Sequence, residues 1–566
     1  MESLKKAERF LVTAYYIGVK RIFLHLLFHF KKMLPLGGVF NMSVSRDCDG
    51  RPKLKAPFAH SPLSMISDDV RKGAFTFLND SRDSGMPPAW DMPAPDLWRY
   101  NLHYFQYLPL VQYAQRKELV ENWIEKYTFE ADRPGWTPYP TSLRLRNLVK
   151  YVWIECREDL DKDFAFKAVF LSSLAAQAGM LWRRREFHLG GNHYLENLIT
   201  FQFLRLAIGG ETFSKYGRTS EKEFIGELAE QVAGDGVYFE LSPMYHSVAF
   251  HHLLDLWNIT PATDNIAEPL RRALGKMTSA LKSMWHPDGQ IVLFNDAAFN
   301  IAPLPDELIR YAASLEIAEQ AVEKGASGLY FHSAGKDFVA MDMAPVGPDY
   351  VPAHAHADFG TFELSFEGAR IISDVGTGGY AGWDGRDYER STSAHNTVEI
   401  NGLDQCECWK IFRVARRYRP VNVEFKKTSD GFALSGGHDG YMRLPGRQTH
   451  DREFRWRDGG LLSVSDVVKG DGDLTVVSRL HFAPGAAVEL NGNRFSASVG
   501  PVRCEGVFLG KGGLKKSQGY VASEFGKKNS AEVLEFEWAT GERSVQFFLA
   551  KGALSSWPEI KGGQGV

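Results

Sequence analysis

Residues 360–376 read GTFELSFEGARIISDVG. Their β-branched residues and alternating apolar and polar positions predict two strands that Glu367-Gly368 joins in a tight hairpin. Similar segments recur after about residue 326, and residues 326–566 are therefore predicted to form an antiparallel β-sandwich domain. These segments are DFVAMDM (337–343), HNTVEING (395–402), LLSVSDVV (461–468), LTVVSRLHF (474–482) and VLEFEWA (533–539).

The preceding part of the chain has a helical pattern, with apolar residues spaced three and four apart. Residues 96–325 are predicted to be a domain of antiparallel helix pairs, and residues 1–95 a basic amphipathic segment with an irregular lead-in. The expected fold class is therefore α+β multidomain. Helical examples are LWRYNLHYFQYLPLVQYA (97–114), SLRLRNLVKYVWIEC (142–156), FAFKAVFLSSLAAQAGMLW (164–182) and HYLENLITFQFLRLAIGG (193–210).

The composition is that of a globular protein with two large domains. The chain has 566 residues, of which 44% are hydrophobic and 24% charged. A net charge of −3 gives no general attraction to nucleic acid, and five scattered cysteines indicate neither a disulfide framework nor a cysteine-rich zinc site. The aromatic content of 13% indicates either aromatic cores or a cleft whose rings stack on sugars.

The first 35 residues carry seven Lys or Arg against two acidic residues. Lys20-Arg21 separates the apolar stretches LVTAYYIGV (11–19) and IFLHLLFHF (22–30), so neither reaches the length of a membrane span. No small-residue cleavage site follows an uninterrupted apolar core, which argues against a standard signal peptide. We expect an amphipathic helix that rests on a membrane surface or on the protein itself.

The densest cluster of reactive side chains is His354-Ala-His356-Ala-Asp358. In an extended chain residues two apart point the same way, so these three side chains would share one face. Asp374 follows in IISDVG and His395 in STSAHNTV, and the hairpin would bring Asp374 back towards the start of its partner strand. Two imidazoles and a carboxylate suffice for a zinc site, although hydrogen-bonded strand residues are the alternative.

Two helix starts carry further candidates. In GGNHYLEN (190–197), the glycines permit a tight turn and Asn192 is expected to cap a helix that presents His193 and Glu196. In ELSPMYH (240–246), the Ser-Pro pair predicts a helix with Tyr245 in its first turn, where free N–H groups favour an anion. A capping Asn and a buried structural Tyr are the alternatives.

The segment WTPYPTSLRLRN (136–147) combines aromatic rings with arginines. Trp136 and Tyr139 are candidates for stacking on sugars, and Arg144 for pairing with a carboxylate or sulfate, although an ordinary helix fits equally well. Tyr388 is included in the same expected substrate-binding set.

Together, GGNHYLEN, SPMYH, HAHADFGTFEL, the aspartate of IISDVG, and SAHNTV resemble the heparinase II/III superfamily of bacterial polysaccharide lyases. The resemblance spans roughly residues 95 to 410 and implies an incomplete (α/α) toroid followed by an antiparallel β-sandwich, with the cleft between them. It implies a bacterial cell envelope or periplasmic location. The weak secretion signal leaves a cytoplasmic or membrane-associated location open.

The resemblance also implies roles. Asn192 would neutralise a uronate carboxylate, Tyr245 would transfer a proton, and His354 would be its partner base. His356, Asp374 and His395 would bind one divalent metal, zinc by ligand type, in a mainly structural role. His193 would be catalytic and Glu196 substrate-binding, as in some members of the family.

These residue types suit β-elimination from a uronic acid in an acidic polysaccharide. Loss of the proton next to a carboxylate creates a dianion, which a hydrogen-bond donor stabilises by roughly 3–4 kcal/mol. The reaction needs no nucleotide or redox cofactor, and no Walker-type phosphate loop occurs in the sequence. The alternatives are a metal-dependent glycan hydrolase and a non-catalytic glycan-binding protein. The sequence does not indicate the oligomeric state.

Overall fold

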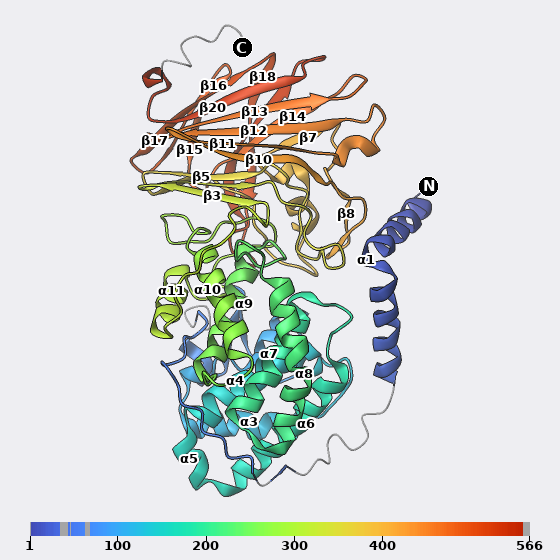
Figure 1. Ribbon diagram of the computed structural model, residues 1–566, viewed down its shortest axis with the longest axis vertical. Coiled ribbons are helices and arrows are strands. Elements are labelled where there is room, and N and C mark those ends of the chain that lie inside the picture. The colour runs from blue at the N-terminus through green and yellow to red at the C-terminus, as the bar shows by residue number, and fades with distance from the viewer. Residues whose placement is uncertain (1, 34–43, 46, 63–67, 558–566) are drawn as a thin grey trace.

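The computed structural model describes residues 2–33, 44–45, 47–62 and 68–557. Helices come first along the chain and strands second, and the two kinds of element form separate halves of the molecule. The helices α2 to α11 lie in the lower half of Figure 1 and the large sheets in the upper half. The predicted order of a helical domain followed by antiparallel sheets is confirmed.

The helical half is built around an aromatic core. Trp98, Trp123 and Trp153 are almost completely buried in it, so much of the aromatic content serves packing. The helices are α1 (Glu2–Met33), α2 (Asp96–Tyr104), α3 (Tyr113–Lys126), α4 (Pro138–Leu148), α5 (Arg157–Lys162), α6 (Phe164–Arg184), α7 (Gly191–Ala207), α8 (Gly210–Gln231), α9 (Pro243–Ile259), α10 (Ala267–Leu281), α11 (Pro305–Ser314) and the short α12 (Arg386–Glu389).

Two regions of the helical half and its lead-in differ from the sequence prediction. The helical pattern over residues 97–114 is interrupted, because Phe105 adopts a left-handed φ of 60° and ends α2. A 3₁₀ turn with Pro109 follows before α3 begins. The lead-in contains the hairpin β1 (Ala74–Phe77) and β2 (Asp80–Asp83), which contributes Phe75 and Phe77 to the helical core.

The second half contains three main antiparallel sheets that share one core. The eight-stranded sheet has the order β10-β11-β12-β13-β20-β17-β16-β15, and the two four-stranded sheets have the orders β18-β19-β14-β7 and β3-β4-β5-β6. Phe362, in the sheet of order β3-β4-β5-β6, packs against Phe454 and Phe547 of the eight-stranded sheet. The strands are β3 (Leu329–Ala334), β4 (Asp337–Asp342), β5 (Phe362–Phe366), β6 (Ala369–Ile372), β7 (Val398–Ile400), β8 (Cys408–Trp409), β9 (Arg413–Val414), β10 (Pro420–Thr428), β11 (Gly431–His438), β12 (Thr449–Arg457), β13 (Leu461–Lys469), β14 (Val476–His481), β15 (Ala487–Asn491), β16 (Arg494–Val499), β17 (Val502–Leu509), β18 (Gly512–Val521), β19 (Asn529–Trp538) and β20 (Ser544–Lys551).

The hairpin predicted at residues 360–376 is present. Strands β5 and β6 pair antiparallel, and both turn residues have positive φ, 49° at Glu367 and 90° at Gly368. The hairpin returns Asp374 to the start of β5, where its Oδ2 accepts a hydrogen bond of 2.7 Å from the Thr361 hydroxyl. The placement of Asp374 beside the start of its partner strand is therefore confirmed.

The segment from His354 to Asp358 is not a strand, contrary to the expectation of one shared face. It forms turns and bends before β5. Backbone and side-chain contacts with residues 295 and 296 hold it, including the hydrogen bond from the His356 N–H to Asn295 Oδ1 at 2.9 Å. The helical half thus determines where the two imidazoles lie.

Candidate active site

A cavity of about 1590 Å³ lies between the two halves of the molecule. Its walls come from the first turns of α4, α7 and α9, from the loops at residues 350–354 and 378–383, and from one side of α1. Of the predicted site residues, Tyr139, Asn192, His193, Tyr245 and His354 line this cavity. Helix starts and loops distant in sequence therefore meet in one cleft.

Tyr245 and His354 lie side by side on the wall of the cleft. The Ser242 hydroxyl accepts a hydrogen bond from the Tyr245 N–H at 3.2 Å, which confirms the predicted cap and places Tyr245 in the first turn of α9. The Tyr245 ring stacks on the His354 imidazole with 3.9 Å between centroids, and its hydroxyl lies 2.8 Å from that of Tyr380. Burial, and then the neighbouring Tyr380, raise the pKa of Tyr245 well above its ordinary value, so this side chain is a neutral phenol that can donate a proton.

Two carboxylates that the sequence reasoning did not identify orient His354. Its Nδ1 lies 2.9 Å from Asp296 Oδ2, and its Nε2 lies 3.1 Å from Glu240 Oε2. Asp296 also contacts His356 Nε2 at 2.9 Å and the guanidinium of Arg386. Burial would raise the pKa of Asp296, but the charge of Arg386 and the two histidine hydrogen bonds hold it well below its ordinary value. Asp296 is therefore an anion that fixes both imidazoles.

The sequence offered only a weak signal for these carboxylates. Glu240 directly precedes the SPMYH motif, but Asp296 lies 58 residues before His354 in a segment without a recognisable motif. Only the tertiary contact identifies Asp296.

Asn192 and His193 lie at the start of α7, on the cleft wall. The helix begins at Gly191 with Gly190 as its N-cap residue, so the predicted capping role of Asn192 is wrong. The tight turn arises because Gly190 has a φ of 68°, and the Asn192 N–H donates to Glu240 Oε1 at 2.8 Å. His193 Nδ1 lies 3.0 Å from Glu186 Oε1. Burial lowers its pKa, but the charge and hydrogen bond of Glu186, together with the charges of Glu240 and Glu196, outweigh burial and raise the pKa overall.

Four residues predicted to bind substrate lie away from the cleft wall. Trp136 packs against Trp123, and Arg144 is fully buried with its guanidinium 4.2 Å from the centre of that ring. Glu196 is buried beneath the site, where its carboxylate pairs with Arg146 and with His252 Nδ1 at 2.5 Å. Tyr388 lies in the sheet domain, 5.3 Å from the Tyr520 ring.

In the described part of the chain, none of these four residues lines the cavity. The expectation that they contact substrate is therefore not supported. The physical reason is that their polar groups already have buried partners. The lysine and arginine side chains that do line the cleft are Lys32, Arg184 and Arg413.

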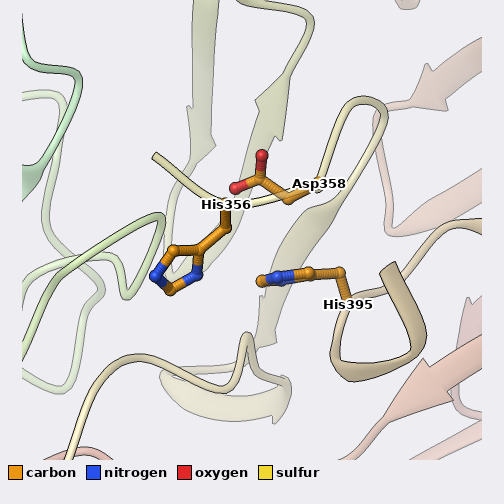
Figure 2. Close-up of side chains that lie close together, drawn as sticks. All are labelled: His356, Asp358 and His395. Atoms are coloured by element: carbon orange, nitrogen blue, oxygen red, sulfur yellow. The ribbon is translucent and has the colours of Figure 1, made fainter. Parts of the chain in front are cut away.

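His356, Asp358 and His395 point toward one another, as Figure 2 shows. One potential ligand atom from each lies within 4.8 Å of the others, and all three residues are almost completely buried. Within the described part of the chain, His356 Nδ1, Asp358 Oδ2 and His395 Nε2 have no hydrogen-bond partner. Buried polar atoms without partners are rare, so this donor set fits a metal ion.

Asp374, the third predicted ligand, lies directly behind His395. Its Oδ1 is 2.8 Å from His395 Nδ1, an arrangement that commonly orients a metal-binding histidine. Burial lowers the pKa of His395, but the charge and hydrogen bond of Asp374, together with the charge of Asp358, outweigh burial and raise the pKa to about 9. Burial raises the pKa of Asp358 to about 6. The two carboxylates therefore create a buried site that attracts positive charge.

Comparison with known families agrees with this architecture. Residues 105–311 match the family described as "Heparinase II/III N-terminus", and residues 318–546 match "Heparinase II/III-like, C-terminal". The two matches follow the order of the helical and sheet halves. The chain belongs to the heparinase II/III-like family, and the suspected family is thereby confirmed.

Two relatives are named heparin-sulfate lyase. The relative from Pedobacter heparinus is 26% identical over 367 residues, 56% of this chain and 54% of the relative. The relative from Bacteroides stercoris is 27% identical over 38% of this chain and 37% of its own length. The matched region thus spans about half or less of these relatives.

Solved structures share the fold over nearly the whole chain. A mutant of the heparan sulfate lyase HepC from Pedobacter heparinus superimposes with a TM-score of 0.60 and 18% identity, covering 93% of this chain and 88% of that one. A heparinase III structure gives a TM-score of 0.68 and 15% identity, covering 93% and 87%. The fold is therefore an incomplete (α/α) toroid followed by an antiparallel β-sandwich.

Proposed function

We propose that this protein is a polysaccharide lyase that cleaves a uronic-acid-containing acidic polysaccharide by β-elimination. The observation that carries the proposal is the Tyr245–His354 pair, stacked at 3.9 Å in a cleft that Asn192 and His193 also line. The family membership and the named activity of the two relatives support it. Elimination requires proton transfer and stabilisation of a carboxylate dianion, and these side chains supply both.

The proposed mechanism assigns one task to each group. The Asn192 amide donates a hydrogen bond to the uronate carboxylate and stabilises the charge that develops when the C5 proton leaves. His354 is the partner base for that proton, and Asp296 holds its imidazole in place through Nδ1. The Tyr245 phenol transfers a proton to the glycosidic oxygen as the C4–O bond breaks, and a C4–C5 double bond forms.

The basic groups on the cleft wall fit an acidic substrate. Arg413 takes the place that the sequence interpretation gave to Arg144, because it lines the cavity and Arg144 does not. A sulfate or carboxylate on a neighbouring sugar would pair with such a guanidinium. The substrate class we propose is therefore a uronic-acid polymer that carries further negative charge, as heparan sulfate does.

The metal assignment is also part of the proposal. His356, His395 and Asp358 would hold one divalent cation, zinc by ligand type, with Asp374 either orienting His395 or replacing Asp358 as ligand. When bound, the cation would crosslink the loop at residues 354–358 to the segment before β7. These three residues are buried, and in the described part of the chain they do not line the cavity. The role that we propose for the cation is therefore structural.

The decisive experiment is a screen of acidic polysaccharides for the ultraviolet absorbance of an unsaturated uronate. Heparan sulfate, alginate and hyaluronan would be compared, with Tyr245→Phe as the inactive control. We expect the absorbance to rise with the wild type only. New reducing ends without the chromophore would indicate a hydrolase, and saturable binding without either product would indicate a glycan-binding protein.

A further inference from the structure

Helix α1 contacts the rest of the protein through one of its faces. Arg21 Nη1 donates to the Phe187 carbonyl at 2.8 Å, and Phe28 stacks on His188 at 3.6 Å between centroids. Towards the other end, Trp409 Nε1 donates to the Thr13 hydroxyl at 3.1 Å. In Figure 1, α1 runs beside both halves, from the region of β8 down to the helical domain. Its inner face also closes one side of the cleft.

The opposite face of α1 carries large apolar side chains that are exposed to solvent. We define the outer stripe as Leu11, Tyr15, Val19, Phe23, Phe30 and Met33, which are between 61% and 84% exposed. These residues do not line the cleft. Soluble surfaces rarely carry so many neighbouring large apolar groups, so the stripe indicates a surface that meets an apolar partner.

The charges beside the stripe identify the kind of partner. The described part of α1 contains seven Lys or Arg against two acidic residues, Glu2 and Glu8, and Glu8 is already paired with Arg416. Lys5 and Lys20 are exposed next to the stripe. An apolar face flanked by cations is typical of a helix that lies in the interface of a membrane with anionic lipids.

The geometry favours lying on the membrane over spanning it. By length and composition, two helices in the described residues could cross a membrane, Lys5–Met33 and Phe164–Arg184. The second is largely packed in the core, with 56% of its most apolar window buried. In α1, Gly18 has a φ of 76° and breaks the helix, Lys20-Arg21 lies at mid-length, and one face is bound to the protein. These features suit a helix parallel to a surface.

We propose that the outer stripe of α1 docks the protein onto an anionic lipid surface, so that the cleft closed by α1 stands at a membrane. The occupant of the stripe is the headgroup and acyl boundary of the lipid layer. This surface goes beyond the proposed lyase activity and does not depend on it, because the stripe residues take no part in the cleft.

Vesicle binding by the full chain tests this proposal. The variant Val19→Glu/Phe23→Glu puts charge on the stripe and leaves the inner-face contacts intact. The matched control Phe164→Glu/Val169→Glu makes the same kind of change at two exposed apolar residues of α6, 79% and 47% exposed. We expect the wild type and the control to sediment with phosphatidylglycerol vesicles and the stripe variant to bind at least about tenfold more weakly.

Three further results are expected. Binding falls as salt rises, pure phosphatidylcholine vesicles bind less, and all three proteins melt at the same temperature. Equal binding by the stripe variant and the wild type, or binding by neither, would overturn the proposal. Three other results would also overturn it. A dimer that forms without lipid and is abolished in the stripe variant would indicate that a second copy covers the stripe. Membrane binding that resists an alkaline wash would indicate a spanning helix, and a mature protein isolated without residues 1–33 would indicate a removed segment.

Discussion

Replacement of Tyr245 by Phe removes a single hydroxyl from the wall of the cleft. That hydroxyl lies 2.8 Å from the Tyr380 hydroxyl, while the ring beneath it stacks on His354. Phe keeps the ring and the stack, so the packing of α9 against the loop at residues 350–354 should persist. The variant therefore separates proton transfer from structure.

The expected loss of stability in Tyr245→Phe is small, whereas the expected loss of rate is large. The lost Tyr245–Tyr380 hydrogen bond is half-buried and should lower the free energy of unfolding by about 1 kcal/mol. Loss of a general acid should lower kcat by about 10²–10⁴-fold. Tyr380→Phe removes the same hydrogen bond from the other side and leaves the Tyr245 hydroxyl in place, so it should cost similar stability and less than about tenfold in rate.

The assay is the initial rate of unsaturated uronate formation, with urea unfolding measured on the same preparations. Three proteins are compared: the wild type, Tyr245→Phe and Tyr380→Phe. The reasoning fails if Tyr245→Phe keeps more than about a tenth of the wild-type rate, since an acid–base role predicts a larger loss. It also fails if Tyr380→Phe loses as much activity as Tyr245→Phe, because the essential hydroxyl would then be that of Tyr380.

Three other predictions follow from the site and its supports. Asn192→Ala should lower kcat by about two to three orders of magnitude with KM and melting temperature nearly unchanged, and a destabilised but fully active variant would contradict the assigned role. Elemental analysis should find about one zinc per chain. Both His356→Ala and a chelator should remove the zinc and lower the melting temperature. A wild type that contains no metal and melts like His356→Ala would exclude the metal site. At Asp466, burial would raise the pKa, but the charge of Arg452 and the hydrogen bond from His450 lower it to about 2. Since its folded pKa is depressed, its contribution of about 2 kcal/mol is complete above about pH 4 and is lost as the pH falls towards about 2. Urea unfolding should show this loss in the wild type and not in Asp466→Asn, and equal pH slopes would refute it.

Local chemistry made parts of this protein predictable from its sequence. The turn at Glu367-Gly368 requires two residues with positive φ, and the Ser242-Pro243 pair starts a helix with its own side chain. Both signals act over a few residues, so a single sequence reveals them. The order of helices and strands was likewise predictable, because the periodicity of apolar residues changes from one half of the chain to the other.

Contacts between distant segments were decided only by the tertiary structure. Periodicity shows that a helix has an apolar face but does not show what covers it, so Arg144 and Trp136 read equally well as cleft or core residues. The structure buries both, brings Asp296 to His354 across 58 residues, and places Asp358 with His356 and His395. The sequence by itself determined which elements form and which residue types could do the chemistry. Only the packing of the two halves against each other decided which of those residues meet in the cleft, because that choice depends on long-range burial and not on local spacing.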